Sequence, residues 1–294
     1  MREKNSSSIP YFKKEIFLLK FGGISLAGNE SFGYRVYSYF IISVITYPYL
    51  IIAFGDLFKH EFEVVAQLCI YIGSYLMAVS ITMVTFSNRI KLGKLLDKIQ
   101  QKPFLPNTKR GGKMETELIN QWILYKNNQY IILMAGAGIC YTLAVAYTIM
   151  KRITSSNPQD WAFAFGPITF FNVTYSPNYE ILWMYQNISV FCIVSNLLQA
   201  ISILAAILTF DSKPHAKSTY EQDYTIDVLS IPWKYLESIL RAMIRYHLSI
   251  IEIATDLENI FSNAMFSVYL FTLASLCFEI YRAAMVSIVF IFDY

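Results

Sequence analysis

The segment ILWMYQNISVFCIVSNLLQAISILAAILTF, residues 181–210, decides the fold class because it is long, largely apolar and free of charge. A helix needs about 20 apolar residues to cross roughly 30 Å of hydrocarbon. The apolar residues are continuous rather than alternating, which favours a membrane-spanning helix over a barrel strand. Because the segment is longer than one crossing requires, we expect it to be tilted or to extend past the bilayer.

Similar apolar segments elsewhere in the chain predict a polytopic membrane protein. Hydrophobic residues make up 55% of the 294 residues and charged residues only 15%, against about 25% in soluble domains. A further apolar run, 283–292, is too short to span. We therefore predict an all-α transmembrane bundle that forms a single domain over residues 1–294; the alternative is a soluble all-helical protein. The five predicted spans are 36–54, 64–86, 130–150, 188–210 and 260–278.

The distribution of lysine and arginine predicts the orientation of these spans. The N-terminal 35 residues hold six, the loop 87–129 holds nine and the loop 211–259 holds five, whereas the intervening loops and the C-terminal tail hold one, two and one. Basic loops stay in the cytoplasm, so we expect a cytoplasmic N-terminus and an external C-terminus. The loop 151–180 is then external, and Asn172 heads a glycosylation sequon in it.

Two cytoplasmic segments have distinct patterns. In 232–259, apolar positions alternate by four and three in a heptad-like seam that includes His247 and continues to Phe261, so we expect a long helix that packs against other helices. Pro232 suits the start of this helix. The segment 102–129 contains two prolines and a Gly–Gly pair and is expected to be the most flexible part of the chain.

Motifs and charges argue against enzymes, metal centres and nucleic-acid binding. The three histidines lie in different loops, no nucleotide-binding or hydrolase motif occurs, and the net charge is only +3. We expect no enzyme activity, no metal and no cofactor. The four cysteines lie in separate apolar runs, so small buried hydrophobic residues are expected rather than disulfides. The predicted spans carry no charged residue, which argues against a proton-coupled transporter.

Uncharged polar and aromatic side chains gather in the predicted outer half of the bundle. A mostly apolar cavity with a few hydrogen-bonding groups is how proteins build small-molecule pockets. The alternative is that these side chains form an interfacial aromatic belt and pack between helices. The predicted ligand-binding residues are Tyr71, Tyr75, Tyr141, Thr148, Trp183, Asn187 and Phe191.

Two stretches resemble the insect odorant receptor family: SPNYEILWMYQNIS at 176–189 and HLSIIEIATDLENIFSNAMFSVYLFTLASLCFEIY at 247–281. The resemblance covers residues 11–294. It implies a seven-helix fold with the N-terminus inside, a plasma-membrane location in sensory dendrites, and small volatile odorants as ligands. It also implies assembly with a co-receptor into a heterotetrameric ligand-gated cation channel, held together by cytoplasmic helix extensions.

The chain departs from this family pattern in its number of spans. Five spans and a partial sixth are predicted where the family has seven, so the resemblance implies a chain shortened at its C-terminus, without the helix that lines the pore. Two alternatives remain: a gustatory-type receptor, and a transporter or scaffolding membrane protein without a chemosensory role. A transporter is expected to have paired interrupted helices, whereas Pro48 is the one proline within the predicted spans.

Overall fold

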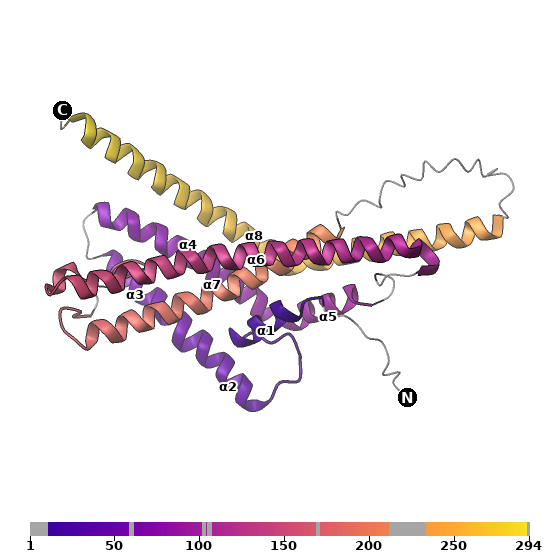
Figure 1. The fold of residues 1–294 in the computed structure, drawn as a ribbon, viewed down its shortest axis with the longest axis horizontal. Helices are drawn as coiled ribbons and strands as arrows, with labels where there is room; N and C mark the ends of the chain where they lie inside the picture. The colour runs from indigo at the N-terminus through magenta and orange to yellow at the C-terminus, as the bar shows by residue number, and fades with distance from the viewer. Residues whose placement is uncertain are drawn as a thin grey trace.

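The computed structural model is mainly helical in the residues that it describes, which are 11–58, 62–101, 104, 108–168, 171–211 and 233–292 (Figure 1). The predicted all-α fold class is confirmed. The helices are α1 (Lys13–Phe21), α2 (Phe32–Phe40), the π-helix η1 (Ile41–Thr46), α3 (Tyr47–Leu57), α4 (Phe62–Ser87), α5 (Arg89–Ile99), α6 (Thr108–Thr154), the 3-10 turn η2 (Pro158–Asp160), α7 (Asn178–Asp211) and α8 (Trp233–Phe292).

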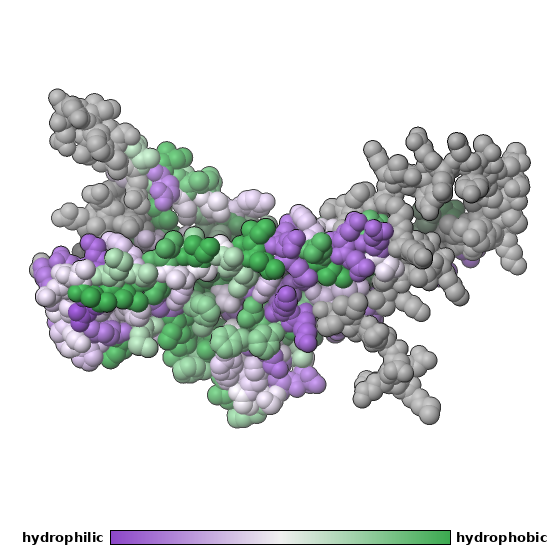
Figure 2. Space-filling view, in the orientation of Figure 1, coloured by the Kyte–Doolittle hydropathy of each residue, from purple (hydrophilic) through white to green (hydrophobic). Residues whose placement is uncertain are grey.

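Five helical segments are long and apolar enough to cross a membrane. All five carry exposed apolar side chains, and Figure 2 shows green apolar residues in a band over α6 with hydrophilic residues on either side of it. Exposed apolar helix surface of this kind is stable in lipid, where the backbone groups are already paired within the helix. The five segments are Phe32–Leu57, Leu68–Ser87, Thr116–Thr154, Asn178–Phe210 and Met243–Tyr281.

Two sequence expectations are corrected by the helix boundaries. Within the segment 102–129, residues 108–129 are not a flexible loop, because α6 begins at Thr108 and runs through Gly111 and Gly112 as one helix of 47 residues. The apolar run 283–292 is not a separate partial span, because it continues α8, which has 60 residues. At 1.5 Å per residue α8 is about 90 Å long. Pro232 lies outside the described residues.

The predicted seam of α8 is buried in one half and exposed in the other. Leu257 and Phe261 are buried at 7% and 4% exposure, but Leu240 and Met243 are exposed at 52% and 62%. His247, expected to be packed, is also exposed. The buried half lies against α4 and α5, where Lys98 and Glu252 form a surface ion pair at 2.6 Å. Within the part of the chain that the structure describes, other helices therefore cover the C-terminal half of the seam and leave Leu240 and Met243 exposed.

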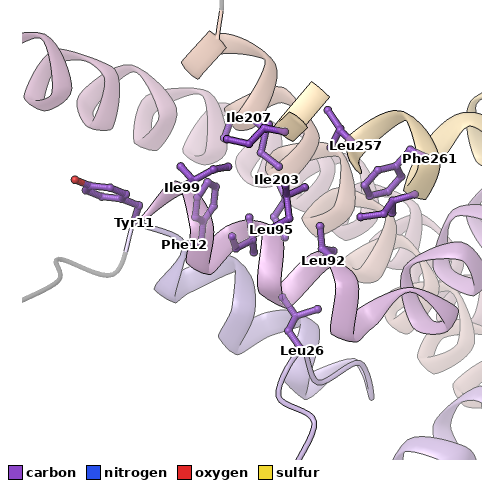
Figure 3. Close-up of a cluster of buried hydrophobic side chains, with 14 of the residues drawn as sticks. Tyr11, Phe12, Leu26, Leu92, Leu95, Ile99, Ile203, Ile207, Leu257 and Phe261 are labelled. Atoms are coloured by element: carbon purple, nitrogen blue, oxygen red, sulfur yellow. The ribbon is translucent and has the colours of Figure 1, made fainter. Parts of the chain in front are cut away.

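A hydrophobic core joins α1, α5, α6, α7 and α8 at one end of the bundle, which we call the α1 end (Figure 3). Trp122 of α6 is fully buried there and packs edge-on against Phe210 at 5.0 Å between ring centres. Next to it, Lys126 Nζ lies 2.6 Å from Glu15 Oε1, and both side chains are at most 3% exposed. Lys126 also donates to the Tyr11 carbonyl at 2.5 Å. This buried pair fixes α1 against α6.

The first span is irregular around Pro48, and tertiary hydrogen bonds compensate for it. Proline has no N–H to donate to the carbonyl four residues earlier, and its ring crowds that carbonyl. The preceding turn widens into the π-helix η1, and its carbonyls accept hydrogen bonds from other helices. Tyr185 OH donates to the Val44 carbonyl at 3.1 Å, Ser189 Oγ to that of Ile45 at 2.6 Å, and Tyr75 OH to that of Thr46 at 2.9 Å.

Candidate ligand site at the loop end

The connection between α6 and α7 folds back into the bundle at the end opposite α1, which we call the loop end. Tyr179 OH donates to the Ala162 carbonyl at 2.7 Å, and Ile168 is 2% exposed. Gly166 has φ +96°, a backbone conformation that favours glycine. A Cβ at Gly166 would also lie 3.3 Å from the ring of Tyr71. This turn, residues 163–168, can therefore approach α4 closely because position 166 has no side chain.

Gln186 of α7 holds the turn in place. Its side chain is fully buried, and its Nε2 donates to the Gly166 carbonyl at 2.9 Å and to Tyr49 OH at 3.2 Å. Its Oε1 accepts from the Phe165 backbone N–H at 3.3 Å. Tyr49 OH in turn donates to the Phe165 carbonyl at 2.6 Å. One amide side chain and one phenol thus pair backbone groups that would otherwise be buried without partners.

A small aromatic cavity lies beneath the turn, between α3 and α4. The rings of Tyr49 and Tyr75 meet edge-on at 5.0 Å, and Tyr71 completes the aromatic wall. The turn contributes Phe165 and Ile168 to the lining. The free volume is about 10 Å³, which is close to the minimum that admits one water molecule. The cavity therefore has mostly apolar and aromatic walls with few polar groups, and room for about one water molecule.

A second group of polar and aromatic side chains lies between α6 and α7. Trp183 Nε1 donates to Thr148 Oγ1 at 2.9 Å, and Asn187 Nδ2 donates to the Trp183 carbonyl at 2.7 Å. Tyr141 OH donates to the Asn187 carbonyl at 3.2 Å. Asn187 Oδ1 is buried and has no hydrogen-bond partner in the described part of the chain. This group pins the two helices together beside the cavity.

Phe165 connects the cavity with the second group. Its ring stacks on Tyr141 at 5.7 Å between centres with an interplanar angle of 20°. Tyr141 also meets Phe191 edge-on at 5.9 Å. Phe165 therefore contacts residues of α3, α6 and α7, and a shift of this residue would change its packing against all three helices.

The seven predicted residues are divided between these groups. Tyr71 and Tyr75 line the cavity, whereas Thr148, Trp183 and Asn187 bond to one another and do not line it. Tyr141 reaches the cavity through Phe165, and Phe191 is half exposed on the bundle surface.

Three site residues were missed by the sequence reasoning: Tyr49, Phe165 and Gln186. Gln186 could have been found, because an amide in the middle of an apolar helix needs a buried partner. Nothing in the local sequence around Phe165 indicates that its turn enters the bundle.

Arg152, at the C-terminal end of α6, contacts both the loop between α6 and α7 and the first turn of α7. Its guanidinium lies 3.9 Å from the ring centre of Trp161 and 2.8 Å from Glu180 Oε1. Cation–π and ion-pair contacts on one side chain hold both ends of the connection near each other.

The described residues contain no group of three or more His, Cys, Asp or Glu side chains that could hold a metal ion. The cysteines are free, but the expectation that all four are buried is wrong. Cys192 is buried, Cys69 is half-buried, and Cys140 and Cys277 are exposed on helix surfaces that the predicted bilayer covers.

Comparison with known proteins bears on the fold. No protein-family model and no curated protein sequence matches this chain. Among solved structures, it is similar to the insect olfactory receptor OR5 from Machilis hrabei, with a TM-score of 0.63 and 13% sequence identity. The similarity covers 92% of this chain and 70% of that one. The neighbour is a receptor, and the resemblance seen in the sequence is supported by this match. The chain has the helical transmembrane fold of an insect olfactory receptor.

Proposed function

We propose that this protein is an odorant receptor subunit that binds small volatile apolar molecules at the loop end. The observation that carries the proposal is the aromatic cavity under the turn 163–168, in a chain with the fold of an olfactory receptor. Tyr49, Tyr71, Tyr75 and Phe165 supply apolar contact area, and the hydroxyl of Tyr71 supplies an orienting hydrogen bond. No further cofactor is needed for such binding.

Ligand entry would require the turn to move. An engineered cavity that takes benzene has about 150 Å³, whereas the cavity here has about 10 Å³. An odorant would therefore displace Phe165 from its place between Tyr141 and the cavity. Since Phe165 is bonded through its backbone to Gln186 and Tyr49, its displacement changes the packing of α3 against α7. The ligand then stabilises the displaced arrangement and shifts the population toward it.

Signalling would proceed through assembly with a co-receptor into a heterotetrameric ligand-gated cation channel. The support within this chain is the exposed half of the α8 seam, which extends beyond the predicted membrane. Apolar side chains there need a partner to leave water. The exposed apolar residues are Leu240 and Met243 of the seam and, beside it on the same helix, Ile244, Leu248 and Ile251, each 48–62% exposed.

The test is to record odorant-evoked current from cells that express this chain with a co-receptor. Phe165→Ala should change the concentration for half-maximal response by about tenfold or more, because it removes the partly buried ring that lines the cavity and stacks on Tyr141. Phe58→Ala is the matched control, because Phe58 is 85% exposed. The proposal fails if the surface-expressed wild type gives no current with any odorant, or if both variants respond alike.

We further propose a plasma-membrane location, in a sensory dendrite as the resemblance implies, with the loop end outside and Asn172 glycosylated. Asn172 is exposed, and its Oδ1 accepts from the Thr174 N–H at 3.0 Å and from Thr174 Oγ1 at 2.6 Å. A glycosidase should then increase the gel mobility of the wild type and leave Asn172→Gln unchanged. An epitope fused ahead of Met1 should stain only permeabilised cells; staining of intact cells would reverse the orientation.

A further inference from the structure

A second cavity lies at the α1 end, between α2 and the junction of α4 and α5. Its free volume is about 110 Å³, and its lining includes Glu30, Tyr34, Arg35, Tyr39, Phe86 and Arg89. It is thus larger and far more polar than the cavity at the loop end, and the two cavities share no lining residue.

The cavity lies at the depth where hydrocarbon gives way to polar lipid headgroups. In the structure the first candidate span starts at Phe32 and the second ends at Ser87, so both have their ends beside the cavity. The side of α2 that adjoins it is apolar and exposed: Phe32 is 82%, Val36 53% and Phe40 52% exposed. Acyl chains can cover such a surface while the headgroup of the same lipid lies in the cavity.

The two arginines of the cavity are free to bind an anion. Neither Arg35 nor Arg89 has an ion-pair partner among the described residues. Arg89 is held in place by a hydrogen bond from its Nη1 to the Phe86 carbonyl at 3.1 Å and by the Phe86 ring, whose centre lies 4.5 Å from the guanidinium. A guanidinium has five N–H donors, so most of those of Arg89 stay available for phosphate oxygens.

Glu30 gives the cavity a second, opposite charge. Its Oε1 is buried and has no hydrogen-bond partner in the described part of the chain. A buried carboxylate oxygen without a donor is costly. The same cavity also holds Arg35 and Arg89. A ligand that fits these charges carries a phosphate for the arginines and a cationic N–H donor for Glu30.

We propose that this cavity binds the headgroup of phosphatidylethanolamine from the adjacent leaflet. The phosphate lies between Arg35 and Arg89, and the primary ammonium donates to Glu30. Choline has no N–H and cannot satisfy that oxygen. A serine headgroup would bring a carboxylate towards Glu30, and an inositol phosphate would bring additional negative charge and more volume than about 110 Å³ holds. Bound lipid would fix α2 against α5.

The experiment measures binding of short-chain phosphatidylethanolamine and of phosphatidylcholine with the same acyl chains to the full chain in detergent. The ammonium of the ethanolamine lipid can donate a charge-assisted hydrogen bond that choline cannot, so the wild type should bind the ethanolamine lipid about tenfold or more tightly than the choline lipid. Glu30→Gln should abolish that preference. Arg89→Gln and Arg35→Gln should weaken both lipids about tenfold.

Exposed charges on the same helix as Arg89 provide matched controls. Lys94→Gln and Asp97→Asn lie on α5 outside the cavity lining and should bind both lipids as the wild type does. If Arg89→Gln does not fold, Arg35→Gln decides, because that side chain is exposed. Equal binding of the two lipids by the wild type, unchanged binding by the arginine variants, or equally tight binding of inorganic phosphate would overturn the proposal.

Discussion

The side-chain amide nitrogen of Gln186, a residue of α7, lies 2.9 Å from the carbonyl oxygen of Gly166, a residue of the inserted turn. The two residues are 20 positions apart in the chain, yet this hydrogen bond and its neighbours fix the turn 163–168 in the bundle. The closed cavity of the candidate site depends on that attachment.

Replacing Gln186 should therefore release the turn. Gln186→Leu leaves the Gly166 carbonyl and the Phe165 N–H without their partner, and each unpaired buried group costs about 1–3 kcal/mol. We expect a lower thermal unfolding temperature in detergent and faster amide hydrogen exchange in 163–168. Met184→Leu, at an exposed position of the same helix, is the control. Unchanged exchange in the turn of Gln186→Leu would show that other contacts hold it.

The buried pair of Lys126 and Glu15 provides a test at the α1 end. Removing one partner of a buried ion pair leaves an uncompensated charge and costs about 3–5 kcal/mol, whereas replacing both by apolar residues is often near neutral. Lys126→Met alone should strongly lower the unfolding temperature, and the double variant Lys126→Met with Glu15→Met should recover most of it. Additive losses in this double-mutant cycle would contradict coupling between the two side chains.

The irregular first span predicts different roles for two tyrosine hydroxyls. Tyr75 OH donates to the Thr46 carbonyl next to the π-helix, so Tyr75→Phe should lower the free energy of unfolding by about 1–3 kcal/mol. The hydroxyl of Tyr71, one helical turn before Tyr75, has no hydrogen bond in the described part of the chain. Tyr71→Phe should therefore change the free energy of unfolding by less than about 0.5 kcal/mol. Equal losses in thermal unfolding would exclude this assignment.

Close contact between α5 and the segment before α2 makes Gly93 sensitive to substitution. A Cβ at Gly93 would lie 2.5 Å from the backbone carbonyl oxygen of Leu26, so either helix α5 or that segment would have to shift. We expect Gly93→Ala to destabilise the protein by about 1–3 kcal/mol despite the better helix propensity of alanine.

Gly138→Ala is the control for this substitution, because nothing lies within 4 Å of its added Cβ. It should be neutral or raise stability by up to about 1 kcal/mol. If Gly93→Ala is as stable as Gly138→Ala, then α5 does not approach Leu26 so closely.

Much of the fold could be predicted because membrane spans are determined locally. The uncharged run 181–210 and its counterparts satisfy their backbone within each helix, so length and apolar composition were sufficient to predict five spans. The extensions were harder. Gly111 and Gly112 indicate a break by their propensity, but α6 continues through them, and the helix of 47 residues as a whole outweighs the cost of two glycines.

The candidate site could be predicted only in part. Aromatic residues at the right depth were sufficient to find Tyr71 and Tyr75, but depth alone also selected Thr148 and Trp183, which bond to each other instead. Depth along a helix gives no information about which neighbour a side chain faces. Phe165 was missed because its place depends on how the turn folds back.

The sequence by itself determined that this chain is a helical membrane protein, because hydrocarbon accepts only long apolar segments with internally paired backbones. Only the tertiary structure decided where its polar side chains meet. Gln186 forms a hydrogen bond with Gly166, Lys126 forms an ion pair with Glu15, and Arg89 and Glu30 line the same cavity. The two residues of each pair are distant in sequence. They are brought together by the packing of whole helices and not by local conformational preference.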